Sequence, residues 1–357
     1  MPIDKPLLAR ARVGRADRFP SAKARRRMAA FMSVTSMAFV LAVIGPAGSV
    51  VTPAAASGTT TQYTISHNGL DRNYFEYVPD GLPTSDVPLV FVLHGGTESA
   101  EQAMEQKRPS SHWMTLADAD KFIVVYPNAA EGPDGKQNWN DCRGDATNLP
   151  DVDDVSFIDT VIGQVSARHN IDLARVDATG ASNGGLMSYR LALELSHKVA
   201  AVGAVIANMA AVSECSAPVN PTSVMIMNGD GDPLMPWDGG CLKTDCSSGS
   251  VLSAAATRDF WTSFNDTSTS PNVHDYPNVN TQDNSEVRRE RYTSGSQGTE
   301  VVFFHVRKTG VKGAGHAEPS ICCKIGKPAE AFVGKQNKDI EGPAELWSFM
   351  KAHTLTT

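Results

Sequence analysis

The sequence lacks the short motifs that mark several common classes of enzyme. It contains no H-E-x-x-H pair for a catalytic zinc ion, no glycine-rich phosphate-binding loop and no dinucleotide-binding fingerprint. None of its cysteines has the spacing of a zinc finger, and we find neither an internal repeat nor a linker to a second domain. We therefore expect a single-domain protein whose chemistry needs no metal and no cofactor.

The amino-terminal part of the sequence does not have the character of a folded domain. A basic cluster at 23–27 precedes an apolar run at 28–45, and small residues at 54–56 resemble a cleavage site. These features predict a secretory signal and amino-terminal extension over residues 1–56. The mature protein would then be one domain over residues 57–357, and we expect it to be secreted and extracellular.

A membrane anchor is the alternative interpretation of the apolar run. Ser33, Thr35 and Ser36 interrupt it, and the helix-breaking pair Gly45-Pro46 follows. No cysteine lies near the predicted cleavage site, which argues against a lipid anchor. We therefore expect no stable attachment to a membrane.

Positive charge is scarce once the leader is removed. Residues 1–56 hold nine Lys or Arg and two Asp or Glu, a surplus of seven, so the net charge of −7 becomes −14 without them. Such an acidic surface repels phosphate backbones. Nucleic acid is therefore excluded as an expected partner.

All six cysteines lie in the part of the chain that we expect to be exported, which favours disulfides over metal ligands or free thiols. Cys241 and Cys246 enclose four residues and could close a local loop. The adjacent Cys322 and Cys323 are expected to reach different partners. The sequence does not choose among the possible pairings.

Strands alternate with helices along the exported part. Apolar runs predict strands at 74–78, 88–93, 122–126, 201–206 and 223–228, followed by two more at 286–293 and 300–307. Helices are predicted at about 153–169, 251–264 and 343–353. This alternation predicts an α/β fold, a mostly parallel central sheet with helices on both faces. The polar stretch 265–285 is expected to be an exposed connection, with a mobile flap as the alternative.

One motif indicates nucleophilic chemistry. Residues 180–184 read Gly-Ala-Ser-Asn-Gly, the G-x-S-x-G pattern, and they lie between an extended stretch at 175–179 and a helical pattern beginning near Leu186. Strand, sharp turn and helix form the context in which this motif presents a serine nucleophile, because close glycines allow the tight turn. Ser182 is therefore the candidate nucleophile. An ordinary glycine-rich loop is the alternative.

A serine hydroxyl needs a base, and the base needs a carboxylate that orients it. His316 ends a glycine-rich loop after the last predicted strand, and we expect it to be the base, whereas His305 should pack within that strand. Carboxylates occur at Asp230, Asp232 and Asp238, in the loop after the strand at 223–228. The order serine, aspartate, histidine is that of the α/β-hydrolase fold.

Two backbone N–H groups could stabilise the charge that develops on a carbonyl oxygen. One belongs to Gly96 in the His-Gly-Gly turn at 94–96, and the other to Asn183, directly after the nucleophile. A glycine turn needed only for backbone geometry would look the same in sequence. We expect these two groups to form an oxyanion hole.

Several of these segments together resemble the secreted esterases of the polyhydroxybutyrate depolymerase family, which also includes feruloyl and acetylxylan esterases. The segments are HGG at 94–96, VVYPNA at 124–129, NWNDC at 138–142, VDDVSFID at 152–159, GASNGGLMSYRLALEL at 180–195, GDPLMPWDGG at 231–240 and GAGH at 313–316. The resemblance extends from about residue 62 to 352. It implies that Asp232, in the D-P-x-x-P segment, is the acid of a Ser182–Asp232–His316 triad.

The chain also departs from the family. The family often has Trp-Pro-Gly soon after the histidine, where this chain has Ala317-Glu318-Pro319. Its polymer-degrading members usually append a substrate-binding domain, and we expect none here. Trp139 and Trp237 are candidates to line a substrate pocket. The aspartates at 151, 153 and 154 could suggest calcium, but we expect them to cap the helix that they precede.

The sequence therefore predicts a secreted serine esterase with an acyl-enzyme intermediate, acting on oligomeric or polymeric ester substrates such as short polyesters. A feruloyl or acetylxylan esterase acting on plant polysaccharide is the first alternative. A peptidase is possible on the same fold, although nothing resembles an accompanying propeller domain. An inactive hydrolase-fold binding protein is the alternative from another class, and the intact serine and histidine argue against it.

Overall fold

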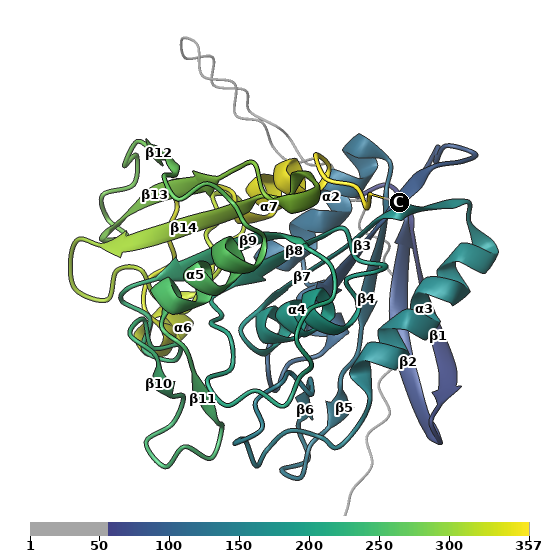
Figure 1. Ribbon diagram of the computed structural model, residues 1–357, viewed down its shortest axis with the longest axis horizontal. Helices are drawn as coiled ribbons and strands as arrows, with labels where there is room; N and C mark the ends of the chain where they lie inside the picture. Colours follow the sequence, from purple (N-terminus) through teal and green to yellow (C-terminus); the bar gives the residue numbers. More distant parts are fainter. Residues whose placement is uncertain (1–55, 357) are drawn as a thin grey trace, which may run out of the picture. The chain divides into compact units, whose positions relative to one another are not determined.

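The protein is described by a computed structural model that covers residues 56–356, so the predicted leader at 1–56 lies outside the described residues except for its last one. Ten strands form the central sheet in the order β1-β2-β4-β3-β7-β8-β9-β14-β13-β12 (Figure 1). They are β1 (Thr59–His67), β2 (Leu70–Val78), β3 (Val87–Leu93), β4 (Ile123–Pro127), β7 (Ile171–Ala181), β8 (Ala201–Val205), β9 (Ser223–Gly229), β12 (Asn272–Asp275), β13 (Ser285–Tyr292) and β14 (Val301–Lys308).

The six strands from β4 to β14 in that order are parallel, and antiparallel strands extend the sheet at both edges. Two short hairpins lie outside it, β5 (Ala130–Glu131) with β6 (Gln137–Asn138) and β10 (Gly240–Cys241) with β11 (Ser250–Val251). Parallel central strands need crossover connections, and helices supply most of them here. The predicted α/β-hydrolase fold is confirmed.

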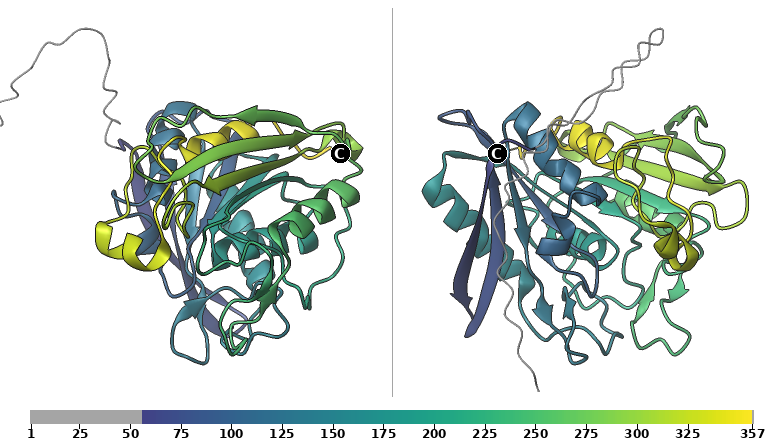
Figure 2. Two further views of the ribbon diagram at one scale, coloured as in Figure 1. Left: turned by 90° about the vertical axis from the view of Figure 1, so that its left-hand side faces the viewer. Right: turned by 180° about the vertical axis from the view of Figure 1, so that it is seen from behind.

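Helices cover both faces of the sheet. The helices α3 (Asp154–Arg168), α4 (Asn183–Glu194) and α5 (Ala254–Phe264) pack on one face. On the other lie α1 (Ala100–Ala103), α2 (His112–Asp120) and α7 (Gly342–Met350). The view from behind in Figure 2 shows α2 and α7 in front of the strands. The helix α6 (Lys327–Val333) has no buried residue.

Strand β3 shows why this part of the chain becomes an inner strand. Leu89, Phe91 and Leu93 point into the core beneath α3, α4 and α5, while Val90 and Val92 point into the core beneath α2 and α7. All seven residues of β3 are buried. Each such side chain contributes about 2 kcal/mol when it leaves water, so an uninterrupted apolar run is the stable choice between two helical layers.

Several predicted elements have the expected positions. The helix predicted at 153–169 is α3, and Asp153 is its N-cap, with the side chain accepting a hydrogen bond from Ser156 N at 2.9 Å. Capping, as expected, accounts for this aspartate. The polar stretch 265–285 contains the short edge strand β12, which pairs with β13 and whose four residues are exposed. The exposed strand β1 was not predicted, because its Thr-rich sequence has no apolar run.

Three disulfides join the six cysteines. Cys142 pairs with Cys215, and Cys241 pairs with Cys246 as the sequence suggested. The expectation for the other two was wrong, since Cys322 and Cys323 pair with each other. The carboxylate of Glu341 accepts the N–H groups of Ile321 and Cys322 and holds the tight turn in which the two sulfurs meet.

Every helix among residues 56–356 falls short of the length and apolar character that a membrane span needs.

Candidate active site

Ser182 lies on a sharp turn between a central strand and a helix. Strand β7 ends at Ala181, helix α4 begins at Asn183, and Ser182 between them has φ +55° and ψ −120°. A non-glycine residue rarely adopts a positive φ, and the surrounding structure must hold it there. Ser182 N donates to Val205 O and Ser182 O accepts from Leu186 N, both at 2.9 Å. The predicted strand, turn and helix are confirmed.

The glycines of the motif are needed because backbones pass very close to this turn. A Cβ on Gly180 would lie 2.5 Å from the Gly184 carbonyl carbon, and a Cβ on Gly184 would lie 2.3 Å from Leu93 O. A Cβ on Gly185 would lie 2.6 Å from the Ala207 Cβ. No side chain fits at these distances, so the G-x-S-x-G-G sequence follows from the packing of the turn against β3 and the chain after β8.

Asp232 and His316 form a hydrogen-bonded pair. His316 Nδ1 donates to Asp232 Oδ2 at 2.6 Å, and the other carboxylate oxygen accepts the N–H groups of Leu234 and Met235 at 2.7 and 2.8 Å. The Asp232 side chain is 2% exposed and that of His316 is 10% exposed. With Nδ1 committed as a donor, Nε2 of a neutral imidazole carries the free lone pair. This arrangement can accept a proton.

The two loops that carry this pair lie directly against each other. A Cβ on Gly229 would lie 2.3 Å from Ala314 O, and a Cβ on Gly231 would lie 2.1 Å from Gly313 O. The parallel strands β9 and β14 are neighbours, so the segments that follow their carboxyl ends share one edge of the sheet. The glycines in G-D-G-D and G-A-G-H therefore let His316 reach Asp232.

Ser182 reaches the same edge of the sheet, because it follows β7, which is separated from β9 only by β8. In the part of the chain that the structure describes, no hydrogen bond joins the Ser182 hydroxyl to His316. Without substrate, such hydrogen bonds are often long and shorten only in the reacting complex. The structure thus joins two of the three predicted residues directly and brings the third to the same edge.

Gly96 and Asn183 lie close together. A Cβ on Gly96 would be 3.4 Å from the Asn183 Cβ, and neither backbone N–H donates to a protein acceptor among residues 56–356. The neighbouring His94 is buried, which lowers the pKa of its imidazole and keeps it neutral. Its Nδ1 donates to Gly95 O at 2.8 Å and its Nε2 accepts Ala129 N–H at 3.1 Å. Two unpaired N–H groups on adjacent, fixed turns suit an oxyanion.

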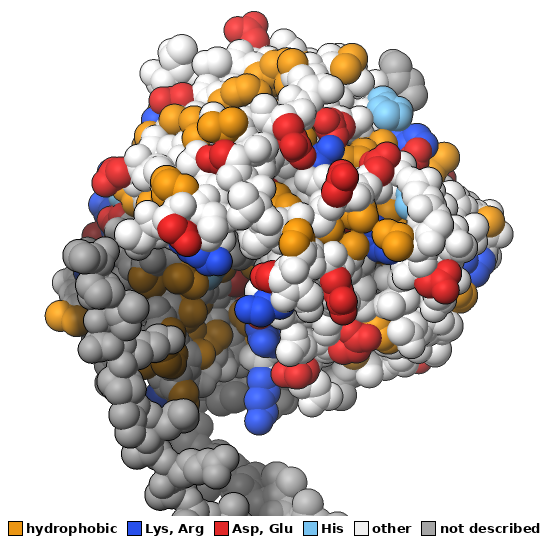
Figure 3. Space-filling view, turned by 90° about the horizontal axis from the view of Figure 1, so that it is seen from below, with side chains coloured by type: hydrophobic (Ala, Val, Ile, Leu, Met, Phe, Trp, Pro, Cys, Tyr) orange, Lys and Arg blue, Asp and Glu red, His pale blue; other side chains and the backbone are white. Residues whose placement is uncertain are grey.

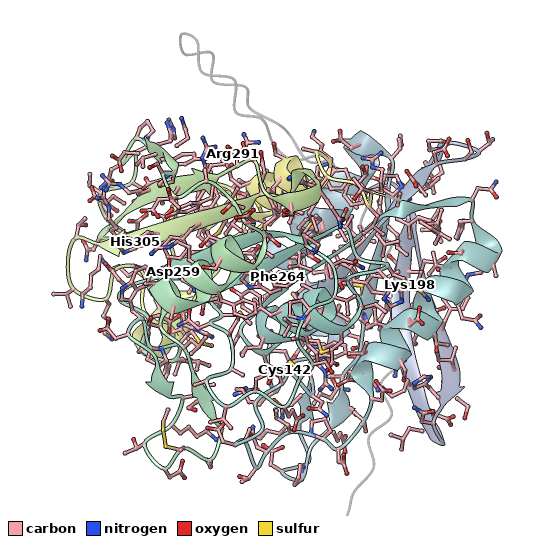
Figure 4. All side chains as sticks on the ribbon, viewed as in Figure 1. Cys142, Lys198, Asp259, Phe264, Arg291 and His305 are labelled. Atoms are coloured by element: carbon pink, nitrogen blue, oxygen red, sulfur yellow. A yellow bond between two sulfur atoms is a disulfide. The ribbon has the colours of Figure 1, made fainter. Side chains whose placement is uncertain are left out.

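The two candidate pocket tryptophans differ. Trp139 is completely buried and donates from Nε1 to His94 O at 3.0 Å, so the expectation that it lines a substrate pocket was wrong. Trp237 is partly exposed and stacks on His305, with ring centroids 4.2 Å apart. His305, labelled on β14 in Figure 4, contacts Asp230 through Nε2 at 3.1 Å. Asp238 is exposed.

Sequence reasoning missed a carboxyl group close to the histidine. Burial and the nearby Glu341 carboxylate raise the pKa of Glu318 to about 8. The residue lies in the segment 317–319, where the expected Trp-Pro-Gly is absent. That departure was the only signal in the sequence, and it does not reveal the burial.

The chain is similar to known esterases. The model of the family described as esterase PHB depolymerase matches residues 72–243. A probable feruloyl esterase C from Aspergillus terreus is 30% identical over 202 residues, which are 54% of this chain and 68% of that protein. A poly(3-hydroxyalkanoate) depolymerase C from Paucimonas lemoignei is 36% identical over 116 residues, 32% of this chain and 26% of that protein.

A bifunctional acetylxylan esterase/xylanase from Neocallimastix patriciarum is 32% identical over 133 residues, 37% of this chain and 17% of that protein. The chain thus spans only about a quarter, or less, of the length of two of these relatives. Among solved structures, an acetyl xylan esterase from Aspergillus awamori has a TM-score of 0.47 and 14% identity, over 70% of this chain and 94% of that one.

Proposed function

The chain belongs to the esterase PHB depolymerase family, and from this membership we propose that it is a secreted serine esterase with Ser182, His316 and Asp232 as its catalytic residues. The observation that carries the proposal is the positive φ of Ser182 on its turn, at the sheet edge that also holds the hydrogen-bonded His316 and Asp232. The family match includes Ser182 and Asp232 and ends before His316.

The proposed reaction has two steps. His316 Nε2 takes the proton of Ser182 Oγ as that oxygen attacks the ester carbonyl, and the leaving alcohol receives the proton when the C–O bond breaks. A water molecule then gives a proton to the same imidazole as it attacks the acyl carbonyl, and the bond to Ser182 breaks as the imidazole returns that proton to Ser182 Oγ, which releases the acid. Asp232 holds the Nδ1–H of His316 throughout, which fixes the ring and stabilises its cationic form.

The N–H groups of Gly96 and Asn183 would hold the oxyanion of each tetrahedral intermediate. Both are unpaired in the described structure, and that of Asn183 belongs to the first residue of α4, where the helix dipole favours negative charge. Removing one such donor typically costs about 10² to 10³ in rate. Two of them therefore supply a large part of the expected acceleration.

Short polyester chains or oligomers are the proposed substrates, with feruloyl or acetylated polysaccharide esters as the alternative that the relatives also favour. Figure 3 shows acidic and hydrophobic side chains interspersed, with fewer Lys and Arg, over the face where β5, β6, β10 and β11 lie in Figure 1. Such a face suits neutral, apolar esters better than polyanions. The partly exposed Trp237 would contact the acyl or aromatic group.

Secretion is part of the proposal. Cys142–Cys215, Cys241–Cys246 and Cys322–Cys323 leave no free cysteine among residues 56–356, as in proteins folded in an oxidising compartment. The expected signal at 1–56 agrees with this, and its cleavage can be read from the amino terminus of protein recovered from culture medium.

Covalent labelling tests the enzyme class against an inactive binding protein. A fluorophosphonate should label folded wild-type protein at Ser182, identified by mass spectrometry, and Ser182→Ala should lower kcat about 10⁴- to 10⁶-fold. The control is Ser166→Ala, which removes another hydroxyl, bonded to Ile162 O on α3, and should change neither labelling nor kcat. Absence of label on Ser182 in folded protein would reject the proposal.

Substrate class is tested by comparing kcat/KM on hydroxybutyrate oligomers, methyl ferulate and acetylated xylan. We expect the highest value for the oligomers. A higher value for methyl ferulate or acetylated xylan would favour the alternative, with the same catalytic residues.

A further inference from the structure

One short segment contacts the turns that carry the two proposed oxyanion donors. We call residues 137–141 the bridge segment. On the Gly96 side, Gln137 O accepts Thr97 N–H at 2.8 Å and the Trp139 indole donates to His94 O at 3.0 Å. On the Asn183 side, Trp139 N donates to Asn183 Oδ1 at 2.7 Å. The bridge segment thus connects two turns that are far apart in sequence.

The side chain of Asn183 has all its hydrogen-bonding groups engaged by this segment. Its Oδ1 accepts from Trp139 N, while its Nδ2 donates to Trp139 O at 3.0 Å and to Asp141 Oδ2 at 2.5 Å. The backbone N–H of the same residue is the unpaired proposed donor. A side chain held by three hydrogen bonds cannot rotate without leaving buried polar groups unpaired, so it fixes the backbone at this position.

Asp141 is itself held rigidly. Its buried carboxylate receives two hydrogen bonds from the Arg143 side chain, Nε at 2.8 Å and Nη2 at 2.7 Å, and that side chain also donates to Ser248 O. Both side chains are almost completely buried. The next residue, Cys142, is tied to Cys215, and Figure 4 places it below α4. Burying two charges costs desolvation free energy, which their attraction offsets only when the geometry is good. We therefore regard this pair as a rigid support and not as a source of stability.

We propose that Asp141 is a positioning residue of the oxyanion hole. By accepting a hydrogen bond from Asn183 Nδ2, it sets the separation between the backbone N–H groups of Asn183 and Gly96. The inference rests on the proposed function. Asp141 does not contact substrate in this role. Its effect should appear in the transition state, where the hole is filled, and not in the binding of the neutral ester.

Two double variants isolate this role, because both remove the ion pair and the Ser248 contact. Asp141→Asn/Arg143→Met keeps an oxygen that can accept from Asn183 Nδ2, whereas Asp141→Ala/Arg143→Met does not. Active enzyme is counted by fluorophosphonate labelling of Ser182 carried to completion. We measure kcat, KM and the inhibition constant of an alkyl boronic acid, whose adduct with the serine places an oxygen in the hole.

We expect kcat of the Ala/Met variant to fall about 10²-fold, the loss typical of a misplaced or missing donor. Boronate affinity should fall in parallel and KM should stay nearly unchanged, while the Asn/Met variant should retain most of kcat. Equal kcat per labelled site in the two variants would overturn the role of Asp141. A wild-type protein without ester turnover and without label on Ser182 would instead reject the proposed function, and the positioning role with it.

Asn183→Ala provides a second test that leaves the Asp141–Arg143 pair intact. It retains the backbone N–H and should lower kcat to a similar extent with KM unchanged. In the Ala/Met background it should add little, because both changes remove the same restraint. An unchanged kcat in Asn183→Ala alone would contradict the proposal even if the double variants failed to fold. Where the Ala/Met variant folds, full additivity would contradict it as well.

The matched control is Glu76→Gln. Glu76 is also a buried carboxylate paired with an arginine, Arg168, and it contacts His169 near the amino end of β7, opposite to the Ser182 turn. We expect this variant to lose stability and to keep kcat per labelled site. A loss of kcat equal to that of the Ala/Met variant would show that any buried charge defect has this effect and would overturn the specific role of Asp141.

Discussion

Two histidine–aspartate pairs lie on neighbouring segments of this protein, and only one of them has the geometry of a catalytic pair. Asp230 and Asp232 are two residues apart after β9. Asp232 bonds His316 through Nδ1 at 2.6 Å, which leaves Nε2 free, whereas Asp230 meets His305 at Nε2 at 3.1 Å. The ring nitrogen left free by the aspartate is therefore Nε2 in His316 and Nδ1 in His305. In a serine hydrolase, Nε2 must face the hydroxyl.

The surroundings of the two pairs differ as well. His305 lies inside strand β14 with its ring stacked on Trp237, and Asp230 also accepts Lys308 N–H. Burial acts to raise the pKa of Asp230, but the hydrogen bonds from His305 and Lys308 outweigh it and lower that pKa. His316 instead lies on a loop beyond the strand. Contact between a histidine and a carboxylate is therefore insufficient, since ring orientation and position relative to the sheet edge decide which pair can take a proton.

The largest expected difference is between the two histidines. His316→Ala should lower kcat about 10⁴- to 10⁶-fold, because it removes the imidazole that takes the Ser182 proton. His305→Ala should lower kcat by no more than about tenfold, while losing the stacking on Trp237, worth about 0.5–1.5 kcal/mol of stability. Steady-state kinetics with a soluble ester and thermal unfolding measure both effects. A comparable loss of kcat in His305→Ala would remove the distinction between the pairs.

The next largest difference in kcat is expected among variants of the three aspartates that follow β9. Asp232→Asn should lower kcat about 10⁴-fold, because an amide at this position favours the wrong imidazole tautomer. Asp230→Asn should keep most of kcat, and so should Asp238→Asn, since Asp238 is exposed. Kinetics of the three variants, each checked for folding by circular dichroism, measure the difference. If the large loss appears in Asp230→Asn or Asp238→Asn, the acid is misassigned.

Local sequence was enough to predict the turn at Ser182. Its glycines, the strand before it and the helix after it act over a dozen residues, and the packing distances at Gly180 and Gly184 explain why no other residue fits. The choice between Asp230 and Asp232 could not be made this way, because both follow the same strand. It required the family resemblance, and in the structure the two differ by the ring nitrogen that they meet.

Trp139 and the pair Cys322–Cys323 were misjudged for a different reason. A tryptophan among Asn and Asp looks exposed in sequence, but Asn138 and Asp141 are themselves buried, and Asp141 forms an ion pair with Arg143. The adjacent cysteines meet because Glu341, about twenty residues away, holds their turn. Such long-range polar contacts leave no periodic pattern in the sequence. Contacts of this kind also hold the residues of the candidate site in place. The site residues were therefore predictable from the sequence, whereas the contacts that hold them were not.

The smallest expected effect is on the pH dependence of stability, and it distinguishes the surroundings of His316 from those of His305. Glu318, two residues after His316, has its pKa raised to about 8 from an ordinary 4.5 by burial and by the Glu341 carboxylate. The folded protein therefore retains this proton while the unfolded chain releases it. The contribution of Glu318 to stability should decline as pH rises from about 4.5 to about 8, and the full penalty should remain above that range.

Glu318→Gln removes this penalty. The variant should match the wild type in Tm at pH 4 and exceed it at pH 9, with about 2–4 °C for each kcal/mol relieved. Scanning calorimetry at pH 4, 6.5 and 9 measures the difference, and Glu105→Gln, an exposed glutamate, is the control that should show no such trend. A Tm difference that does not change with pH would show that the Glu318 carboxyl ionises normally. The pKa of Glu318 would then not distinguish the segment after His316 from the strand that carries His305.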